Sequence, residues 1–312
     1  QSVMFVLIQN ICRYYYTRDM WRPSLHIDMS PVKRMFPFSV KILVTTIINT
    51  INNNVLTFIF GNIFPMKTVG NFTQAMKWDT MAYTTISGTI EQVAQPILVE
   101  IADDKDRELR VFRKMIRFTA FLVFPCLFGL SLVAEEFILV TISAKWIDSV
   151  PLLQILCVGG AFMPFYTMYQ HLVISAGRSD IYMWCNIGQI ILQIVIILAF
   201  HSFGIVTMVI AYTAFTIAWL GVWHIFAKRL IGIGFLDIAK DIAPFMLASA
   251  GVMVITHYLT TSLLCGISPY LASPFVLLPL RVIIAAILYY GVMKAARVKI
   301  MDECINYIRR RR

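Results

Sequence analysis

The sequence predicts an all-α polytopic membrane protein, a helical bundle of about eight transmembrane helices. Hydrophobic residues make up 59% of the 312 residues and charged residues 14%, whereas an ordinary soluble domain has about 45–50% and about 25%. The apolar residues occur in runs long enough to cross a bilayer. Basic residues gather in every second connection between these runs, as they do in cytoplasmic loops of membrane proteins. The composition excludes a disordered chain, a secreted disulfide scaffold and almost any soluble enzyme.

The first four expected helices follow from uncharged stretches. Residues 42–66 carry no charged side chain, and residues 79–100 carry only Glu91 between charges at their two ends. Two further uncharged stretches are 118–134 and 149–177. We therefore expect membrane spans at roughly 36–62, 79–101, 117–139 and 150–175.

The last four helices follow in the same way. The uncharged run 181–227 would make about 70 Å of helix, roughly twice the thickness of a bilayer core. It must therefore turn once, and the segment HSFG at 201–204 is the polar, glycine-containing break near its middle. Residues 242–280 are again uncharged, and an apolar run continues past Arg281. We expect these spans at roughly 181–200, 204–226, 240–260 and 275–295.

The basic residues predict the orientation of the bundle. Of the 27 lysines and arginines, 22 lie before the first span, after the eighth, or in alternate connections between spans. The other connections hold only Lys67, Lys77 and Lys145. Because short cytoplasmic loops collect basic residues, we expect the start of the chain, the 102–117 loop and the C-terminus in the cytoplasm. The basic run 309–312 is interpreted as a topology anchor at an anionic leaflet and not as a nucleic-acid site.

No motif in the sequence indicates bond-making chemistry. The six cysteines form no CxxC pair, and the five histidines are scattered. The sequence has no Ser-His-Asp pattern, zinc-protease motif or glycine-rich phosphate loop. We therefore expect neither an enzyme nor a bound metal or organic cofactor.

Two patterns concern helix geometry. Leu109, Phe112 and Ile116 fall on one face of a basic segment, which predicts a helix lying on the lipid headgroups before the third span. Gly159 and Gly160 permit bending or close helix contact within the fourth span.

Polar residues inside three spans form the candidate sites. At 100° per residue they fall within arcs of about 120° in the first span, about 100° in the second and about 60° in the fifth. The candidates on these three stripes are Lys41, Thr45, Asn49, Asn52, Asn53, Glu91, Gln95, Asn186, Gln189 and Gln193.

Two interpretations of the stripes stay open. Amides can hydrogen-bond between helices and hold the bundle together, or they can line a wet cavity that binds a substrate. Lys41 is either a snorkelling side chain or a cavity cation. Glu91 is the only acidic residue that we expect well inside a span, which favours a cavity role or the coupling of Na⁺ or H⁺. Arg281 is either an interfacial anchor, which we favour, or a cavity charge.

Several segments resemble one family of bacterial membrane proteins. They are PVKRMFPFSVKI (31–42), VGNFTQAMK (69–77), TTISGTIEQVAQPILVEIADDKDRELRVFRKMIRFTAFLVFPCLFGLSLVAEEFIL (84–139), Lys145-Trp146, Pro164 and Ala176-Gly177-Arg178. Phe72 stands where similar proteins usually have tyrosine. In order and spacing these segments resemble the oligosaccharidyl-lipid and polysaccharide branch of the multidrug and toxin extrusion-like superfamily. That branch includes the O-antigen and capsule flippases.

The resemblance implies two six-helix halves around a central cavity, with two extra C-terminal helices. Residues 1–35 would then be the end of a preceding helix and a cytoplasmic linker. Residues 36–226 would be the second half, and residues 227–312 the extra helices with a basic cytoplasmic tail. Because residues 1–11 resemble the tail of an apolar helix, we expect the C-terminal part of a longer protein.

The function implied by the resemblance is translocation of a polyprenyl-diphosphate-linked oligosaccharide to the outer leaflet of the bacterial inner membrane, by alternating access. Lys41 and the asparagines of the first span could line the path, and Arg281 is a poorer candidate. The implied partners are the lipid-linked glycan, membrane lipid and polysaccharide assembly proteins, without nucleic acid. Two alternatives stay open: a cation-coupled multidrug antiporter of the same superfamily, and a membrane-embedded glycosyl polymerase or transferase. Such an enzyme would be expected to have a large catalytic loop.

Overall fold

The computed structural model describes residues 60–101, 104–264, 273–296 and 300–301, together with short parts of 4–47. Within these residues the secondary structure is helical throughout, without a strand. Residues 1–40 and 41–312 form two compact units, and the second contains all the helices from α3 onward.

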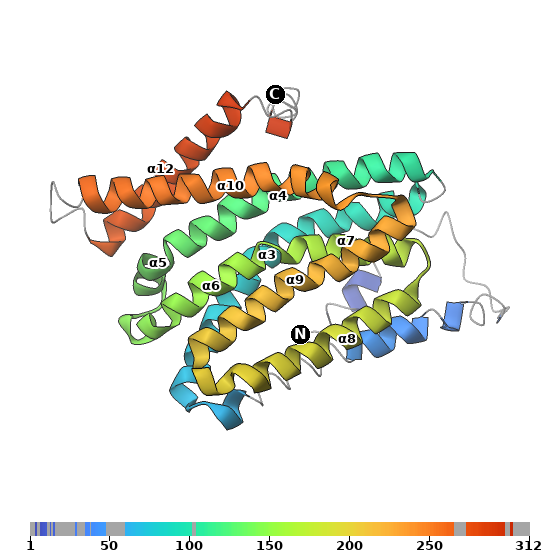
Figure 1. Ribbon diagram of the computed structural model, residues 1–312, viewed down its shortest axis with the longest axis horizontal. Coiled ribbons are helices and arrows are strands. Elements are labelled where there is room, and N and C mark those ends of the chain that lie inside the picture. The colour runs from blue at the N-terminus through green and yellow to red at the C-terminus, as the bar shows by residue number, and fades with distance from the viewer. Residues whose placement is uncertain are drawn as a thin grey trace. The chain divides into compact units, whose positions relative to one another are not determined.

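The helices of the second unit follow one another along the chain with short connections (Figure 1). They are α3 (Met66–Glu100), α4 (Lys105–Leu132), α5 (Ala134–Thr141), the 3-10 turn η1 (Ala144–Ser149), α6 (Val150–Gly160), α7 (Met163–Ser175), α8 (Ser179–Phe200), the 3-10 turn η2 (His201–Phe203), α9 (Ile205–Ile231), α10 (Phe235–Tyr258), the π-helical η3 (Leu259–Leu264) and α12 (Pro274–Ala295).

Among the described residues, six helical segments are long and apolar enough to cross a membrane. They are Lys105–Leu132, Ala144–Ser175, Ser179–Phe203, Ile205–Ile231, Phe235–Ser262 and Pro274–Ala295. These six correspond to the third to eighth spans expected from the sequence, so the chain is a multi-pass membrane protein with an all-α fold.

The first two expected spans have a different outcome. Most of 36–62 lies outside the described residues, although Met35–Ile47 forms a shorter apolar helix. The second span lies within α3, which begins at Met66, well before the expected position 79. With 35 residues, α3 is long enough to cross a bilayer. Because of its polar residues, no stretch of α3 long enough to cross a membrane is as apolar as those in the six segments above.

The turn predicted at 201–204 joins α8 to α9. Residues 201–203 form η2, and Gly204 follows with a φ of 90°, a left-handed conformation that glycine adopts without steric cost. The two helices pack side by side and run in opposite directions (Figure 1). The polar break in the uncharged run is therefore a tight turn between two spans, as the sequence predicts.

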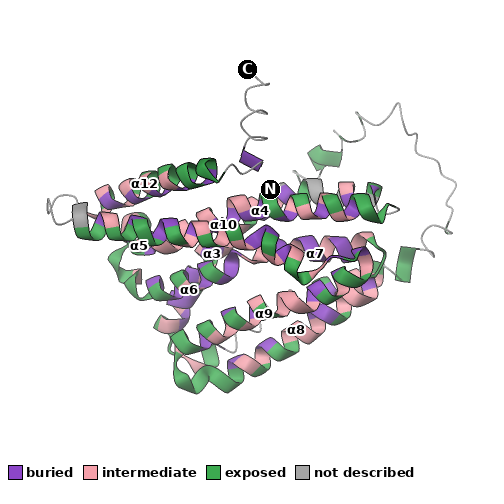
Figure 2. Cartoon of the chain, turned by 45° about the horizontal axis from the view of Figure 1, so that its top comes forward, coloured by how far each residue is buried: buried purple, intermediate pink, exposed green. Residues whose placement is uncertain are grey.

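The centre of the bundle is formed by α6 and α7. In the most apolar stretch of the α6–α7 segment, 50% of the residues are buried inside the protein. The corresponding share is 22% for α8, α9 and α12, so these three helices are peripheral. Helices α3, α4 and α9 pack against α6 and α7. Figure 2 shows exposed residues along α8 and α12, whose outer faces would meet lipid.

The helix expected on the headgroups before the third span does not exist as a separate element. Helix α4 runs without interruption from Lys105 to Leu132, and Phe112 and Ile116 have no exposed surface. Phe112 packs on Tyr169 of α7, with ring centroids 5.4 Å apart. The prediction was wrong because periodicity identifies an apolar face without showing whether lipid or another helix covers it.

Candidate functional site

Side chains from three helices line a cavity of about 210 Å³, which we call the amide cavity. It lies between α3, α7 and α8, and its lining residues are Tyr83, Met163, Tyr166, Thr167, Gln170, Asn186, Gln189, Ile190 and Gln193. Asn186, Gln189 and Gln193 are the stripe predicted on the fifth span. The structure brings all three to one cavity, in which two tyrosines, a threonine and Gln170 add further polar groups.

The amides of the cavity differ in how far they are already engaged. Gln170 Nε2 donates to Asn186 Oδ1 at 3.4 Å, and Asn186 Nδ2 donates to the carbonyl oxygen of Tyr182 at 2.6 Å. These bonds hold Asn186 in place. Gln193 is only 5% exposed, and within the described residues the side chains of Gln189 and Gln193 form no hydrogen bond. Their amide groups therefore remain to bind water or a ligand.

Helix α8 has the amphipathic character of a membrane helix that faces a polar cavity. Its apolar side chains Trp184, Ile191, Val195 and Leu198 are exposed. In a soluble protein such residues would be buried, whereas in a membrane they would contact lipid, with the amides on the opposite, inward side of the helix. This arrangement explains why a stripe of amides is tolerated in a run of otherwise apolar residues.

The remaining stripe residues are placed only in part. Lys41 is half-buried, and Thr45 is fully buried with its hydroxyl donating to the Lys41 carbonyl oxygen at 2.8 Å. Outside the described residues lie Asn49, Asn52 and Asn53, as do the side chains of Glu91 and Gln95 on α3. Their proposed role in a cavity stays a prediction.

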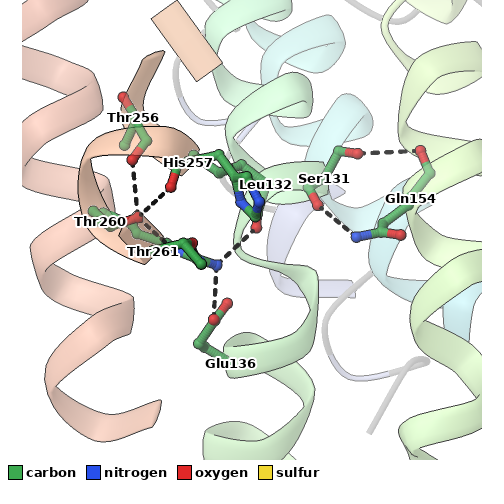
Figure 3. Close-up of polar contacts among 9 residues, drawn as sticks. Ser131, Leu132, Glu136, Gln154, Thr256, His257, Thr260 and Thr261 are labelled. Atoms are coloured by element: carbon green, nitrogen blue, oxygen red, sulfur yellow. Dashed lines mark hydrogen bonds and ion pairs between the residues drawn. The ribbon is translucent and has the colours of Figure 1, made fainter. Parts of the chain in front are cut away.

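Arg281 of α12 forms a buried ion pair with Glu136 of α5. Arg281 Nη1 lies 2.7 Å from Glu136 Oε1, and both side chains are 8% exposed. The guanidinium also donates to the hydroxyls of Thr260 and Thr261, each at 3.1 Å, and to the Leu132 carbonyl oxygen at 3.4 Å (Figure 3). The ion pair thus ties α5 and α12 to the end of α10 and η3.

This burial differs from the exposed interfacial anchor that the sequence favours for Arg281. Sequence reasoning also missed Glu136, although it falls inside the third expected span, because its partner lies 145 positions later in the chain. The one signal in the sequence is that an acidic and a basic residue each fall within an apolar run. A charge at bilayer depth normally has a partner, so the two could have been expected to pair. Nothing in their spacing identifies the pair.

A second cavity of about 510 Å³ borders Arg281. Its polar lining includes Ser131, Glu135, Gln154 and His257. Ser131 and Gln154 each donate from the side chain to the other's backbone carbonyl, at 3.3 and 3.4 Å (Figure 3). Because Glu136 already neutralises Arg281, an anionic ligand in this cavity would have to compete with a carboxylate for the guanidinium.

A second ion cluster joins α4 to α10. Arg113 donates to both carboxylate oxygens of Asp241, at 2.7 and 3.1 Å, and Asp241 is 5% exposed. Asp237 lies 3.6 Å from Arg113, and Arg117 lies 3.8 Å from Asp241. The bidentate pair holds α4 and α10 together at this point. The basic residues of this expected cytoplasmic segment therefore also have a structural role.

Comparison with known proteins shows which family the chain resembles. Residues 3–151 match the family described as "Polysaccharide biosynthesis protein". This match covers just under half of the chain, and together with the relatives below it supports a protein of the polysaccharide biosynthesis family. This finding confirms the resemblance derived from the sequence motifs.

Three relatives support the assignment to the polysaccharide biosynthesis family. The chain is 28% identical over 193 residues to a membrane protein in the cps region of Klebsiella pneumoniae, covering 62% of this chain and 39% of that protein. It is 28% identical over 181 residues to the lipopolysaccharide biosynthesis protein WzxC of Escherichia coli, covering 58% and 37%. It is 24% identical over 175 residues to the teichuronic acid biosynthesis protein TuaB of Bacillus subtilis, covering 56% and 36%. Each match spans less than two fifths of the relative's length.

Proposed function

We propose that this protein takes part in surface polysaccharide biosynthesis as a flippase for a lipid-linked oligosaccharide. The family match supports this class of process, and so do relatives named for lipopolysaccharide and teichuronic acid biosynthesis. The observation that carries the proposal is the amide cavity. A glycan presents hydroxyl groups that both donate and accept hydrogen bonds, and side-chain amides can do the same. Placing such amides in an apolar helix is costly unless they face a polar partner.

The proposed mechanism is alternating access between the two leaflets of the bacterial cell membrane. Residues 36–226 would form one half of the transporter, and residues 227–312 would add two helices and a cytoplasmic C-terminus. Lys41 would neutralise part of the polyprenyl diphosphate, with the asparagines of the first span beside it. The amide cavity would bind sugar hydroxyls during the passage, and a Na⁺ or H⁺ gradient would supply the driving force.

The test removes the free amides of the cavity without removing volume. In a host lacking the gene, the full-length protein with Gln189→Leu and Gln193→Leu should restore less than about a tenth of wild-type surface polysaccharide, since several hydrogen bonds at about 1 kcal/mol each are lost. Lipid-linked oligosaccharide should accumulate in the cytoplasmic leaflet. Gln92→Leu, the same change at an exposed glutamine of α3, is the matched control and should restore export fully.

Membrane abundance of each variant is measured by immunoblot, so that loss of export is separated from loss of protein. Wild-type export in the double variant would contradict a role of the amides in transport. Unchanged polysaccharide after gene disruption, together with increased sensitivity to cationic drugs, would instead favour the multidrug antiporter.

A further inference from the structure

A buried carboxylate on α3 lies outside the sites described so far. Asp79 is 6% exposed, and within the described residues its Oδ1 atom has no hydrogen-bond partner. The Oγ1 atom of Thr213 on α9, which is also 6% exposed, has no partner there either. Two unpartnered oxygens from different helices are thus held in the interior of a membrane bundle, where each is costly.

The glycine pair at the end of α6 explains how the two side chains come so close to this helix. A Cβ atom on Gly160 would collide with Asp79 Oδ1, and a Cβ on Gly159 would lie 2.9 Å from Thr213 Cγ2. The sequence predicts bending or close contact at this pair, and the structure shows both, since α6 ends at Gly160 and α7 begins at Met163. Helix interruptions of this kind are common at the ion sites of transporters.

The oxygens border a small cavity, which we call the Asp79 cavity. Its volume is about 30 Å³, above the roughly 10–15 Å³ that a cavity needs to hold one water molecule. The tyrosines Tyr83 and Tyr212 contribute to its lining together with Asp79, Thr213 and the glycine pair. The cavity therefore has room for one small ion, and oxygen-bearing side chains line it beside the apolar Met76, Leu156 and Met163.

Charge decides what the cavity would hold. An isolated carboxylate in a low-dielectric interior must either take up a proton or gain a compensating cation. No lysine, arginine or histidine of the described residues forms an ion pair with Asp79. If a proton alone neutralised Asp79, neither the empty volume of the cavity nor the unpartnered Oγ1 atom of Thr213 would be needed. A single carboxylate balances one monovalent charge, and no group of three or more metal-ligating side chains occurs in the described part of the chain. We propose that the Asp79 cavity binds one Na⁺ ion, with Asp79 and Thr213 as ligands.

The position of the site suggests its use. Tyr83 and Met163 line both the Asp79 cavity and the amide cavity, so the two share a wall. An ion that draws α3, α6 and α9 together would also change the shape of the amide cavity. This coupling of ion binding to glycan transport depends on the proposed function, whereas the ion site itself does not.

The experiment measures ion binding directly and needs no transport activity. Purified full-length protein in lipid nanodiscs is titrated with radioactive ²²Na⁺ at constant ionic strength in choline chloride. We expect saturable binding at one site in the wild type, at least a tenfold loss of affinity in Asp79→Asn, and a severalfold loss in Thr213→Val. Thr213→Val keeps the side-chain shape that packs on Gly159 and removes only the hydroxyl, so it tests the site even if Asp79→Asn fails to fold.

The matched control is Asp180→Asn, which makes the same change at a 44% exposed carboxylate paired with Arg178. It should bind Na⁺ like the wild type. Absence of saturable Na⁺ binding to folded wild-type protein would overturn the proposal, as would wild-type affinity in both site variants. If the site variants lose ²²Na⁺ binding but export polysaccharide normally, the ion site stands and its coupling role is refuted. If the wild-type protein binds Na⁺ but exports no glycan, only the proposed function is refuted.

Discussion

The ion pair between Glu136 and Arg281 gives the sharpest test of what holds this bundle together. In Glu136→Gln the amide oxygen can still accept from Arg281, but the guanidinium is left as a buried charge without a counterion. Removing one partner of a buried pair costs about 3–5 kcal/mol. Because the hydrogen bond can persist, we expect the lower end, about 3 kcal/mol, which corresponds to a fall in Tm of about 6–12 °C.

The double variant Glu136→Leu with Arg281→Met removes both charges and keeps similar volume. Replacing a complete buried pair by apolar residues is often neutral in energy. The hydroxyl of Thr260 keeps a partner in this variant, because it also donates to the Thr256 carbonyl oxygen at 2.8 Å. We therefore expect the double variant to recover most of the stability lost in Glu136→Gln.

The assay is thermal unfolding of the full-length protein in detergent, followed by tryptophan fluorescence. Glu135→Gln is the matched control, since Glu135 is the exposed neighbour of Glu136 and its substitution should change Tm by less than about 2 °C. An unchanged Tm in Glu136→Gln would refute the reasoning. So would a double variant as unstable as the single one, because the loss would then arise from packing and not from an uncompensated charge.

Three further predictions test the helix contacts and the topology. Gly160→Ala should destabilise the bundle by about 1–3 kcal/mol through overpacking, measured in the same thermal assay. The control Gly251→Ala, at a helical glycine with open space around it, should be neutral or slightly stabilising. Asp241→Asn should cost about 1.5–3 kcal/mol by weakening the charged hydrogen bonds from its arginine partner on α4, and an unchanged Tm would contradict that tie. With the six native cysteines replaced, Lys105→Cys should resist a membrane-impermeant thiol reagent added to intact cells while Lys145→Cys is labelled, and the reverse pattern would refute the proposed orientation.

The candidate sites were predictable where one helix carries the whole signal. The stripe of Asn186, Gln189 and Gln193 repeats with helical period on a single span, so the polar face was visible in the sequence, although whether it lines a cavity or bonds to a neighbouring helix was not. The turn at 201–204 was predictable for a similar reason, because an uncharged run too long for one bilayer crossing must turn at its polar glycine-containing break.

Other features depend on helices that are far apart in the sequence. The sequence presents Asp79 as the charge at the end of a span, and the structure buries it because α3 begins at Met66. Phe112 and Ile116 form an apolar face that could contact either lipid or another helix. In the structure both side chains are buried, and Phe112 packs against α7. A periodic pattern specifies which residues share a face, but the neighbour of that face is a property of the assembled bundle.

By itself, the sequence determined the class of this protein: an all-α, multi-pass membrane protein that resembles a polysaccharide biosynthesis family, with amides along one face of one span. Hydropathy runs and motif order are local properties, so they can be read without a fold. Only the tertiary structure decided which charges are compensated. Arg281 forms an ion pair with Glu136, 145 positions away in the chain. Asp79 instead lies beside a glycine pair, an unpartnered threonine and a small cavity, without a counterion among the described residues. The cost of a charge in a membrane depends on its nearest neighbours in space, which the helix packing alone supplies.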